Sequence, residues 1–205
     1  AVIVAKEVFG GTGNEYKARF RSLMFNLRDP KNPEFIKQVV TGQLFTEDLA
    51  TMEVKNMASA EVKKQREKWQ ENAAQHSVRP RVYFEEWPDP MMTTIRWVSE
   101  LIEIVGGDDI FREQSFSSLA KGRIVSNQDI LEARPELYIG SWCGKKVKFQ
   151  DVKERHGWHE LPCIKNGQLF EINSTIILQP GPAAILDGVD VLGRLVSAWR
   201  DQKCA

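Results

Sequence analysis

The chain has 205 residues, a length that allows one large domain or two small ones. Its 42% hydrophobic and 27% charged residues are ordinary for a folded globular chain, which excludes disorder and collagen-like repeats as its overall class. Its 28 basic residues equal its 28 acidic residues, so any contact with nucleic acid or an anionic membrane must come from a local patch.

Four further features are not expected. No apolar run approaches the ~20 residues of a membrane-spanning helix, and the opening AVIVAKEVFGG is charged too soon for a signal peptide. Cys143, Cys163 and Cys204 form no C-x-x-C pair, so a disulfide framework and a four-cysteine zinc site are both excluded.

The first third of the chain has helical spacing almost throughout. Tyr16, Phe20 and Leu23 share one face of a helix that Asn14 could cap, with Phe20 and Leu23 turned inward. The spacing predicts an N-terminal all-α helical bundle over residues 1–77. Its helices are expected to run from residue 14 to before Pro30, from Pro33 to Gly42, for a short turn after Thr46, and from Ser59 to about residue 75.

Residues 78–205 alternate short β-rich runs with helical ones, which predicts a three-layer α/β lobe and a two-domain chain. Ser126 and Asp129 have the spacing of a capping box, and Asn166-Gly167 predicts a hairpin turn. Strands are expected at 81–87 and 136–143, with further strands flanking the hairpin turn, and helices at 95–107, after 126, at 149–155 and from about Pro182 to Gln202.

The segment YKARFRSLMFNLRDPKNPEFIKQVV, followed by MAS at 57–59 and a long polar helix, resembles the central domain of the transcription elongation factor TFIIS. The resemblance implies a helical bundle that docks on RNA polymerase II. Five basic residues match the family's basic positions and are the expected docking residues: Lys17, Arg19, Arg21, Arg28 and Lys31.

TFIIS stimulates transcript cleavage through a zinc ribbon that carries an adjacent Asp-Glu pair. The cysteine pattern of this chain cannot form such a ribbon, and Asp108-Asp109 lies in an α/β context instead. We therefore expect a non-enzymatic, nuclear, transcription-associated protein that lacks cleavage activity, with no catalytic residue, no metal site and no required cofactor.

The later motifs RPRVYFEEWPDP, GSWCGKK, RHGW and LQPGPA, within residues 79–204, look like the C-terminal lobe of cobalamin and iron-siderophore periplasmic binding proteins. The resemblance implies a cobalamin or ferric-chelate ligand. Ligands of open α/β sheets sit at the carboxyl ends of the strands, where Trp87 and Trp142 would lie. We expect Trp87, Trp142 and Trp158 to offer flat apolar faces and Arg155 to serve an anionic group, unless the tryptophans only close the core.

Weaker patterns point elsewhere. Gly10-Gly11-Thr12-Gly13 has Tyr16 where a dinucleotide fingerprint needs glycine. His156 and His159 with Cys163 could suggest a metal site, and Cys143 with His156 a nucleophilic pair, but Gly157 and the lack of an orienting acid argue against them. The alternatives that stay open are a ligand-binding module, periplasmic or at the cell surface, and an artificial or gene-model fusion without joint function.

Overall fold

The structure is a computed structural model and describes residues 6–8, 10–179 and 187–204. The chain forms two compact units, Ala1–Lys64 and Gln65–Ala205, which we call unit 1 and unit 2. They divide inside one helix, α6, so the domain boundary expected near residue 77 stays a prediction. Among the described residues, no helix is long and apolar enough to cross a bilayer.

Unit 1 is helical. Its small apolar core consists of Leu23, Phe35, Leu49 and Met57, one residue from each of four helices. Those helices are α2 (Asn14–Arg28), α3 (Pro33–Val40), α4 (Thr46–Thr51) and α5 (Val54–Met57), and α6 (Ala60–Ala74) begins in this unit.

Local sequence signals explain where these helices begin and end. Pro33 takes the first position of α3, where its missing N–H costs nothing, and Gly42 after the helix has a φ of 74°. The Ser59 hydroxyl accepts a hydrogen bond from the Val62 N–H and so caps α6. These boundaries confirm the predicted helices, whereas α5 was not expected.

Two details of the first helix were predicted wrongly. Asn14 does not cap α2: Gly13 is its N-cap residue, and Asn14 is the first residue of the helix. Phe20 does not turn inward but is 39% exposed, while Leu23 is buried. Leu23 is the α2 residue that enters the core of unit 1, and the Phe20 ring instead stacks on Tyr16.

Unit 2 is built on a five-stranded mixed sheet in the order β2-β1-β4-β5, with β3 also paired to β1. β1 pairs in parallel with β4 and β3 and antiparallel with β2, and β4 pairs in parallel with β5. The strands are β1 (Arg81–Pro88), β2 (Met91–Thr93), β3 (Asp108–Asp109), β4 (Leu137–Gly140) and β5 (Leu169–Glu171).

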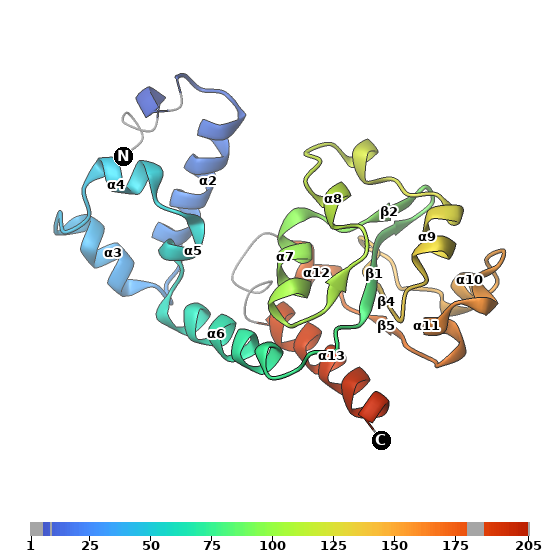
Figure 1. The fold of residues 1–205 in the computed structure, drawn as a ribbon. Helices are drawn as coiled ribbons and strands as arrows, with labels where there is room; N and C mark the ends of the chain where they lie inside the picture. Colours follow the sequence, from blue (N-terminus) through green and yellow to red (C-terminus); the bar gives the residue numbers. More distant parts are fainter. Residues whose placement is uncertain (1–5, 9, 180–186, 205) are drawn as a thin grey trace. The chain divides into compact units, whose positions relative to one another are not determined.

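Alternation along β1 separates two cores. Val82 and Phe84 enter one cluster, and Tyr83 enters the other, because successive strand residues point to opposite faces. Helices cover both faces (Figure 1), so unit 2 has three layers. One face carries α7 (Arg96–Ile104), α12 (Ser174–Ile177) and α13 (Val189–Cys204), and the other carries α9 (Asn127–Ala133), α10 (Phe149–Lys153) and α11 (Pro162–Lys165).

The segment of α6 that falls in unit 2 packs as part of this unit. Trp69 belongs to the first cluster and lies so close to Gly193 of α13 that a Cβ there would come within 2.6 Å of its ring. Gln65 donates a hydrogen bond to the Asp190 carboxylate over 3.0 Å, and buried Arg200 donates to backbone carbonyls of Val78 and Gly106. Residues after Gln65 therefore help to complete the core of unit 2.

The predicted hairpin at Asn166-Gly167 is wrong. Pro162 starts the short helix α11, and Gly167, with a φ of 67°, ends the turn that follows it. β5 then pairs in parallel with β4. The glycine signal was correct, but it marks a helix end instead of a two-residue turn between strands.

Other expected elements of unit 2 are confirmed with shifted bounds. The capping box at Ser126 and Asp129 is present at the start of α9. The short strands β2 and β3 and the helices α8 (Arg112–Ser115) and η1 (Ala120–Arg123) were not expected. The final helix begins at Val189 in the described part of the chain, and its expected start at Pro182 lies outside the described residues.

Candidate functional site

The expected docking residues of unit 1 lie along α2 and the turn that follows it. Lys17 and Arg21 are exposed and four residues apart, so they lie on one helix face. Arg28 in the last turn of α2 and Lys31 in the next turn are also exposed. These four side chains form a basic group that is open to a partner.

Arg19 differs from the other four. Its guanidinium donates a hydrogen bond to the backbone carbonyl of Met52, which follows α4. Arg19 therefore holds the packing of unit 1 together, and its charge is only partly available at the surface. The sequence resemblance could not separate this structural arginine from its neighbours.

Aromatic side chains accompany the basic ones on α2. The rings of Tyr16 and Phe20 stack with their centroids 6.4 Å apart, and Phe25 is 38% exposed. A surface that combines cations with exposed rings is typical of interfaces, whose cores are enriched in aromatic residues and arginine.

The centre of unit 2 holds a buried carboxylate that sequence reasoning missed. Glu85, near the carboxyl end of β1, is fully buried. Its two oxygens accept hydrogen bonds from Tyr83 Oη at 3.0 Å, Tyr138 Oη at 2.9 Å and Trp142 Nε1 at 2.9 Å, and Arg155 binds both oxygens at 2.6 and 3.0 Å. The sequence did contain a signal for this site, because Glu85 follows the apolar residues VYF within a predicted buried strand. A buried charge needs partners, so its position indicates a network of donors around it.

The protonation states follow from this packing. Burial first, and then the Glu85 charge, raise the pKa of Tyr83 and of Tyr138 well above the ordinary value, so both phenols stay neutral donors. Burial alone would lower the pKa of Arg155, but its hydrogen bonds to Glu85 and the charge of that carboxylate raise it. The Glu85–Arg155 pair is thus a neutral unit of two opposite charges.

The predicted ligand-binding tryptophans have different surroundings. Trp158 is fully buried and donates from Nε1 to Asn127 Oδ1 at 2.7 Å, and Trp142 is 5% exposed. Trp87 is half-buried, and Lys145 Nζ lies 4.5 Å from the centroid of its ring. The structure therefore brings Trp142, Arg155 and Trp158 together within one network. Of the three predicted tryptophans, Trp87 is the one that is only half-buried.

A cavity of about 440 Å³ opens beside this network. Its walls come from the segment that joins the end of β1 to the start of β2 (Pro88–Met91), from Val125 and Asn127, and from Arg155 and His156. It lies at the carboxyl end of β1, where ligands bind in open α/β folds. Arg155 faces it, but with its charge already matched by Glu85.

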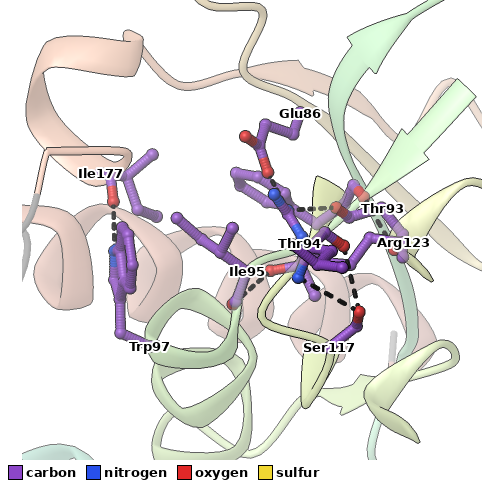
Figure 2. Close-up of polar contacts among 10 residues, drawn as sticks. Glu86, Thr93, Thr94, Ile95, Trp97, Ser117, Arg123 and Ile177 are labelled. Carbon is purple, nitrogen blue, oxygen red and sulfur yellow. Dashed lines mark hydrogen bonds and ion pairs between the residues drawn. The ribbon is translucent and has the colours of Figure 1, made fainter. Parts of the chain in front are cut away.

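A second network fixes the neighbouring edge of the sheet. Figure 2 shows the Arg123 side chain directed at Glu86 and at the Thr93 backbone. Arg123 is ion-paired with Glu86 and donates to the Thr93 carbonyl at 3.1 Å, and Trp97 donates to the Ile177 carbonyl at 3.0 Å. These contacts fasten η1 to β1 and β2, and α7 to α12.

The weak motifs gain no support from the geometry. Among the described residues, no group of three or more His, Cys, Asp or Glu side chains could hold a metal ion. Burial raises the pKa of the Cys163 thiol to about 12, which keeps it protonated, and the side chain of His159 is 75% exposed. Cys143 is exposed, and its pairing with His156 stays untested.

Known proteins resemble both parts of the chain. The family model for the transcription factor S-II (TFIIS) central domain matches residues 1–77. The resemblance is therefore confirmed for this part of the chain. The transcription elongation factor TFIIS of Arabidopsis thaliana is 37% identical over 67 residues, which are 33% of this chain and 18% of that protein.

Two further relatives match the same part. A transcription elongation factor S-II of Caenorhabditis elegans is 44% identical over 62 residues, or 30% of this chain and 20% of that protein. The human PHD finger protein 3 is 40% identical over 65 residues, or 30% of this chain and 3% of that protein. The chain thus spans only a small share of these relatives.

Solved structures confirm the fold of the second resemblance. An iron-binding (periplasmic solute-binding) protein from Staphylococcus epidermidis has a TM-score of 0.56 at 19% identity, covering 82% of this chain and 62% of that one. The vitamin B12 binding protein BtuF of Vibrio cholerae has a TM-score of 0.51 at 16% identity, covering 80% and 59%. At these identities the likeness concerns the fold alone.

Proposed function

We propose that the chain is a non-enzymatic, nuclear, transcription-associated protein that docks on RNA polymerase II through residues 1–77. The observation that carries the proposal is the match of those residues to the TFIIS central domain. The exposed group of Lys17, Arg21, Arg28 and Lys31 supports it, because a basic surface with neighbouring rings suits an acidic protein partner.

The proposal includes no transcript-cleavage activity. The adjacent acidic pair of this chain, Asp108-Asp109, forms strand β3 and pairs with β1. Asp109 is only 4% exposed, and burial raises its pKa to about 6. A carboxylate packed in this way cannot reach out to a metal in a polymerase active site, so Asp109 has a structural role.

A pull-down with purified RNA polymerase II tests the docking proposal. Lys17→Glu with Arg21→Glu reverses two exposed charges without touching the core, and we expect at least a tenfold loss of retained polymerase. The matched control is Lys37→Glu with Lys64→Glu, which reverses two exposed charges outside the basic group. Equal retention by both double variants, or no retention by the unmodified chain, contradicts the proposal.

A second candidate function is supported by the cavity of about 440 Å³ at the carboxyl end of β1. Unit 2 would bind a corrinoid or iron chelate there, as the names of its structural neighbours suggest for those proteins. Such a protein would be periplasmic or at the cell surface. Because Arg155 is neutralised by Glu85, an uncharged part of the ligand would face it, and half-buried Trp87 would supply the ring contact.

Tryptophan fluorescence tests this second function. All six tryptophans lie in unit 2, so quenching by cobalamin or by a ferric siderophore reports binding to that unit. We expect saturable quenching that Trp87→Leu weakens and Trp199→Phe, at a buried position on α13, does not. Linear quenching up to millimolar ligand, alike in all variants, would leave unit 2 without this activity.

A further inference from the structure

Unit 2 has a second cavity, about 250 Å³, whose walls are rich in arginine. Arg66 of α6, Arg96 of α7 and Arg112 of α8 line it together with Glu100 and Glu103. Three arginines from three different helices converge on one small hollow. The guanidinium group presents its donors in a planar fork that matches the oxygens of a phosphate group.

Two of the three arginines form ion pairs, and those pairs are long or exposed. Arg66 has no ion pair with any described residue. Glu103 is held by Arg79 at 2.8 Å, and the contact of Arg112 with the same carboxylate is longer, at 3.5 Å. Arg96 meets Glu100 through Nε alone at 3.0 Å, with both side chains more than half exposed.

The charge balance of the hollow is therefore positive. Its three arginines exceed its two glutamates by one charge, and Arg79 adds another by taking most of the Glu103 interaction. Exposed ion pairs contribute little to stability, so Arg96 and Arg112 can turn toward an incoming anion at small cost. A diphosphate offers more charged oxygens than a single carboxylate, so it can pair with more of these arginines.

The wall of the cavity that contains Phe116 is held in place. Phe116, which follows α8, is 50% exposed, and the Arg96 guanidinium lies 5.3 Å from its ring centroid. The next residue, Ser117, turns its hydroxyl back to Leu119, and Arg123 is anchored to Glu86 and Thr93 (Figure 2). The segment that carries Phe116 is thus fastened to the sheet at its far end.

We propose that this arginine-lined cavity of unit 2 is a binding site for a small molecule with a diphosphate group. Arg66 and Arg112 grip the phosphate oxygens, and Arg96 closes the site from the Phe116 side. The site is separate from the cavity beside Arg155, since the two share no lining residue. It is also independent of the basic group on α2, which belongs to unit 1.

Isothermal titration of the full chain with inorganic pyrophosphate tests the site, at low and constant ionic strength. We expect one site with a dissociation constant in the micromolar to millimolar range, and at least tenfold weaker binding in the double variant Arg66→Gln and Arg112→Gln. Lys165→Gln, which removes one exposed charge from α11 on the opposite face, should bind like the unmodified chain.

Three outcomes with pyrophosphate would overturn the proposal. They are no measurable heat with pyrophosphate, equal binding by the double arginine variant, and an equal loss in Lys165→Gln. Circular dichroism of each variant shows whether the fold is kept, and the single variant Arg66→Gln retains the test if the double variant unfolds. Sulfate in place of pyrophosphate should bind at least tenfold more weakly; equal affinity for sulfate would mean a general anion surface instead of a diphosphate site.

Discussion

The two units use their charged residues in opposite ways. In unit 1, Lys17, Arg21, Arg28 and Lys31 are exposed, and no ion pair joins any of them to another described residue. In unit 2, Glu85, Arg123 and Arg200 are buried and bound to internal partners. These four charges of unit 1 are therefore free for a partner, whereas Arg19 of α2 and the buried charges of unit 2 hold the fold.

The largest expected effect comes from breaking the buried network of unit 2. Glu85→Gln leaves the Arg155 guanidinium without its counter-charge in a site where Glu85 is fully buried. We expect the free energy of unfolding of unit 2 to fall by about 3–5 kcal/mol. Urea unfolding followed by tryptophan fluorescence measures this, because every tryptophan of the chain lies in unit 2.

A double variant makes that prediction specific. Glu85→Gln with Arg155→Met removes both charges while the amide of the new glutamine can still bond to the buried phenols, so much of the lost stability should return. If the double variant is as unstable as Glu85→Gln, the loss comes from packing or from the tyrosine hydroxyls, and the ion pair is not the cause. Either result therefore measures how much the buried ion pair contributes to the free energy of unfolding of unit 2.

The second largest effect concerns the carboxylate of Asp109. Its pKa in the folded protein is about 6, raised from 3.8 mainly by burial. A carboxyl group with a raised folded-state pKa binds its proton more tightly when folded, so its contribution to stability is present below pH 4 and is lost as the pH rises through 6. A shift of two units corresponds to about 3 kcal/mol, an upper figure for this partly hydrogen-bonded group.

Asp109→Asn tests this pH dependence. The amide keeps an oxygen for the Phe111 N–H, which Asp109 Oδ1 now accepts at 3.1 Å, and carries no charge. We expect the variant to be more stable than the unmodified chain at pH 8, by about 1–3 kcal/mol, and to show a flatter dependence of unfolding free energy between pH 4 and 7. Equal slopes in both proteins would contradict the prediction.

A smaller effect is expected at the start of α9. The Ser126 hydroxyl accepts from the Asp129 N–H at 3.1 Å, and the Asp129 carboxylate accepts from the Ser126 N–H at 2.8 Å. The Ser126 hydroxyl also donates to the Asp129 carboxylate at 2.7 Å, and this bond, followed by the one from the Ser126 N–H, lowers the pKa of Asp129. Ser126→Ala should cost about 1 kcal/mol in the same fluorescence assay, and Ser118→Ala, outside any helix, should cost less than half of that.

Sequence reasoning predicted those features that depend on local signals. Pro33, Ser59 and the Ser126 capping box define helix ends through the backbone hydrogen bonds of their own neighbourhood, and all three were predicted. The Asn166-Gly167 signal failed because a glycine with positive φ serves both a hairpin and a helix end, and the choice depends on pairing with distant β4.

The candidate sites show the same division. Helical spacing was enough to predict that Lys17 and Arg21 share one exposed face of α2. The role of Arg19 could not be predicted in this way, because it depends on the Met52 carbonyl, 33 residues away. The ring of donors around Glu85 comes from β1, β4 and later turns, and the arginine-lined cavity from three helices. No single segment contains the pattern, so neither constellation could be read before the chain is folded.

The smallest effect on stability should come from removing the exposed charges of α2. Their neighbour Arg19, which is hydrogen-bonded within unit 1, should have a larger effect. Lys17→Gln with Arg21→Gln removes two charges that make no ion pair with other described residues, so the stability of unit 1 should change by less than about 0.5 kcal/mol. Arg19→Gln loses the hydrogen bond to the Met52 carbonyl and should cost about 1–2 kcal/mol.

Hydrogen exchange of the amides of α2, followed by mass spectrometry in the full chain, measures this difference locally, because unit 1 contains no tryptophan. Exchange in the helix should speed up about fivefold to thirtyfold in Arg19→Gln, and should stay within about twofold of the unmodified chain in the double variant. The polymerase pull-down should respond in the reverse order, since the double variant loses the open charges. If Arg19→Gln lowers polymerase retention as strongly as the double variant while leaving exchange unchanged, then Arg19 belongs to the docking surface, and its contact with Met52 is not what matters.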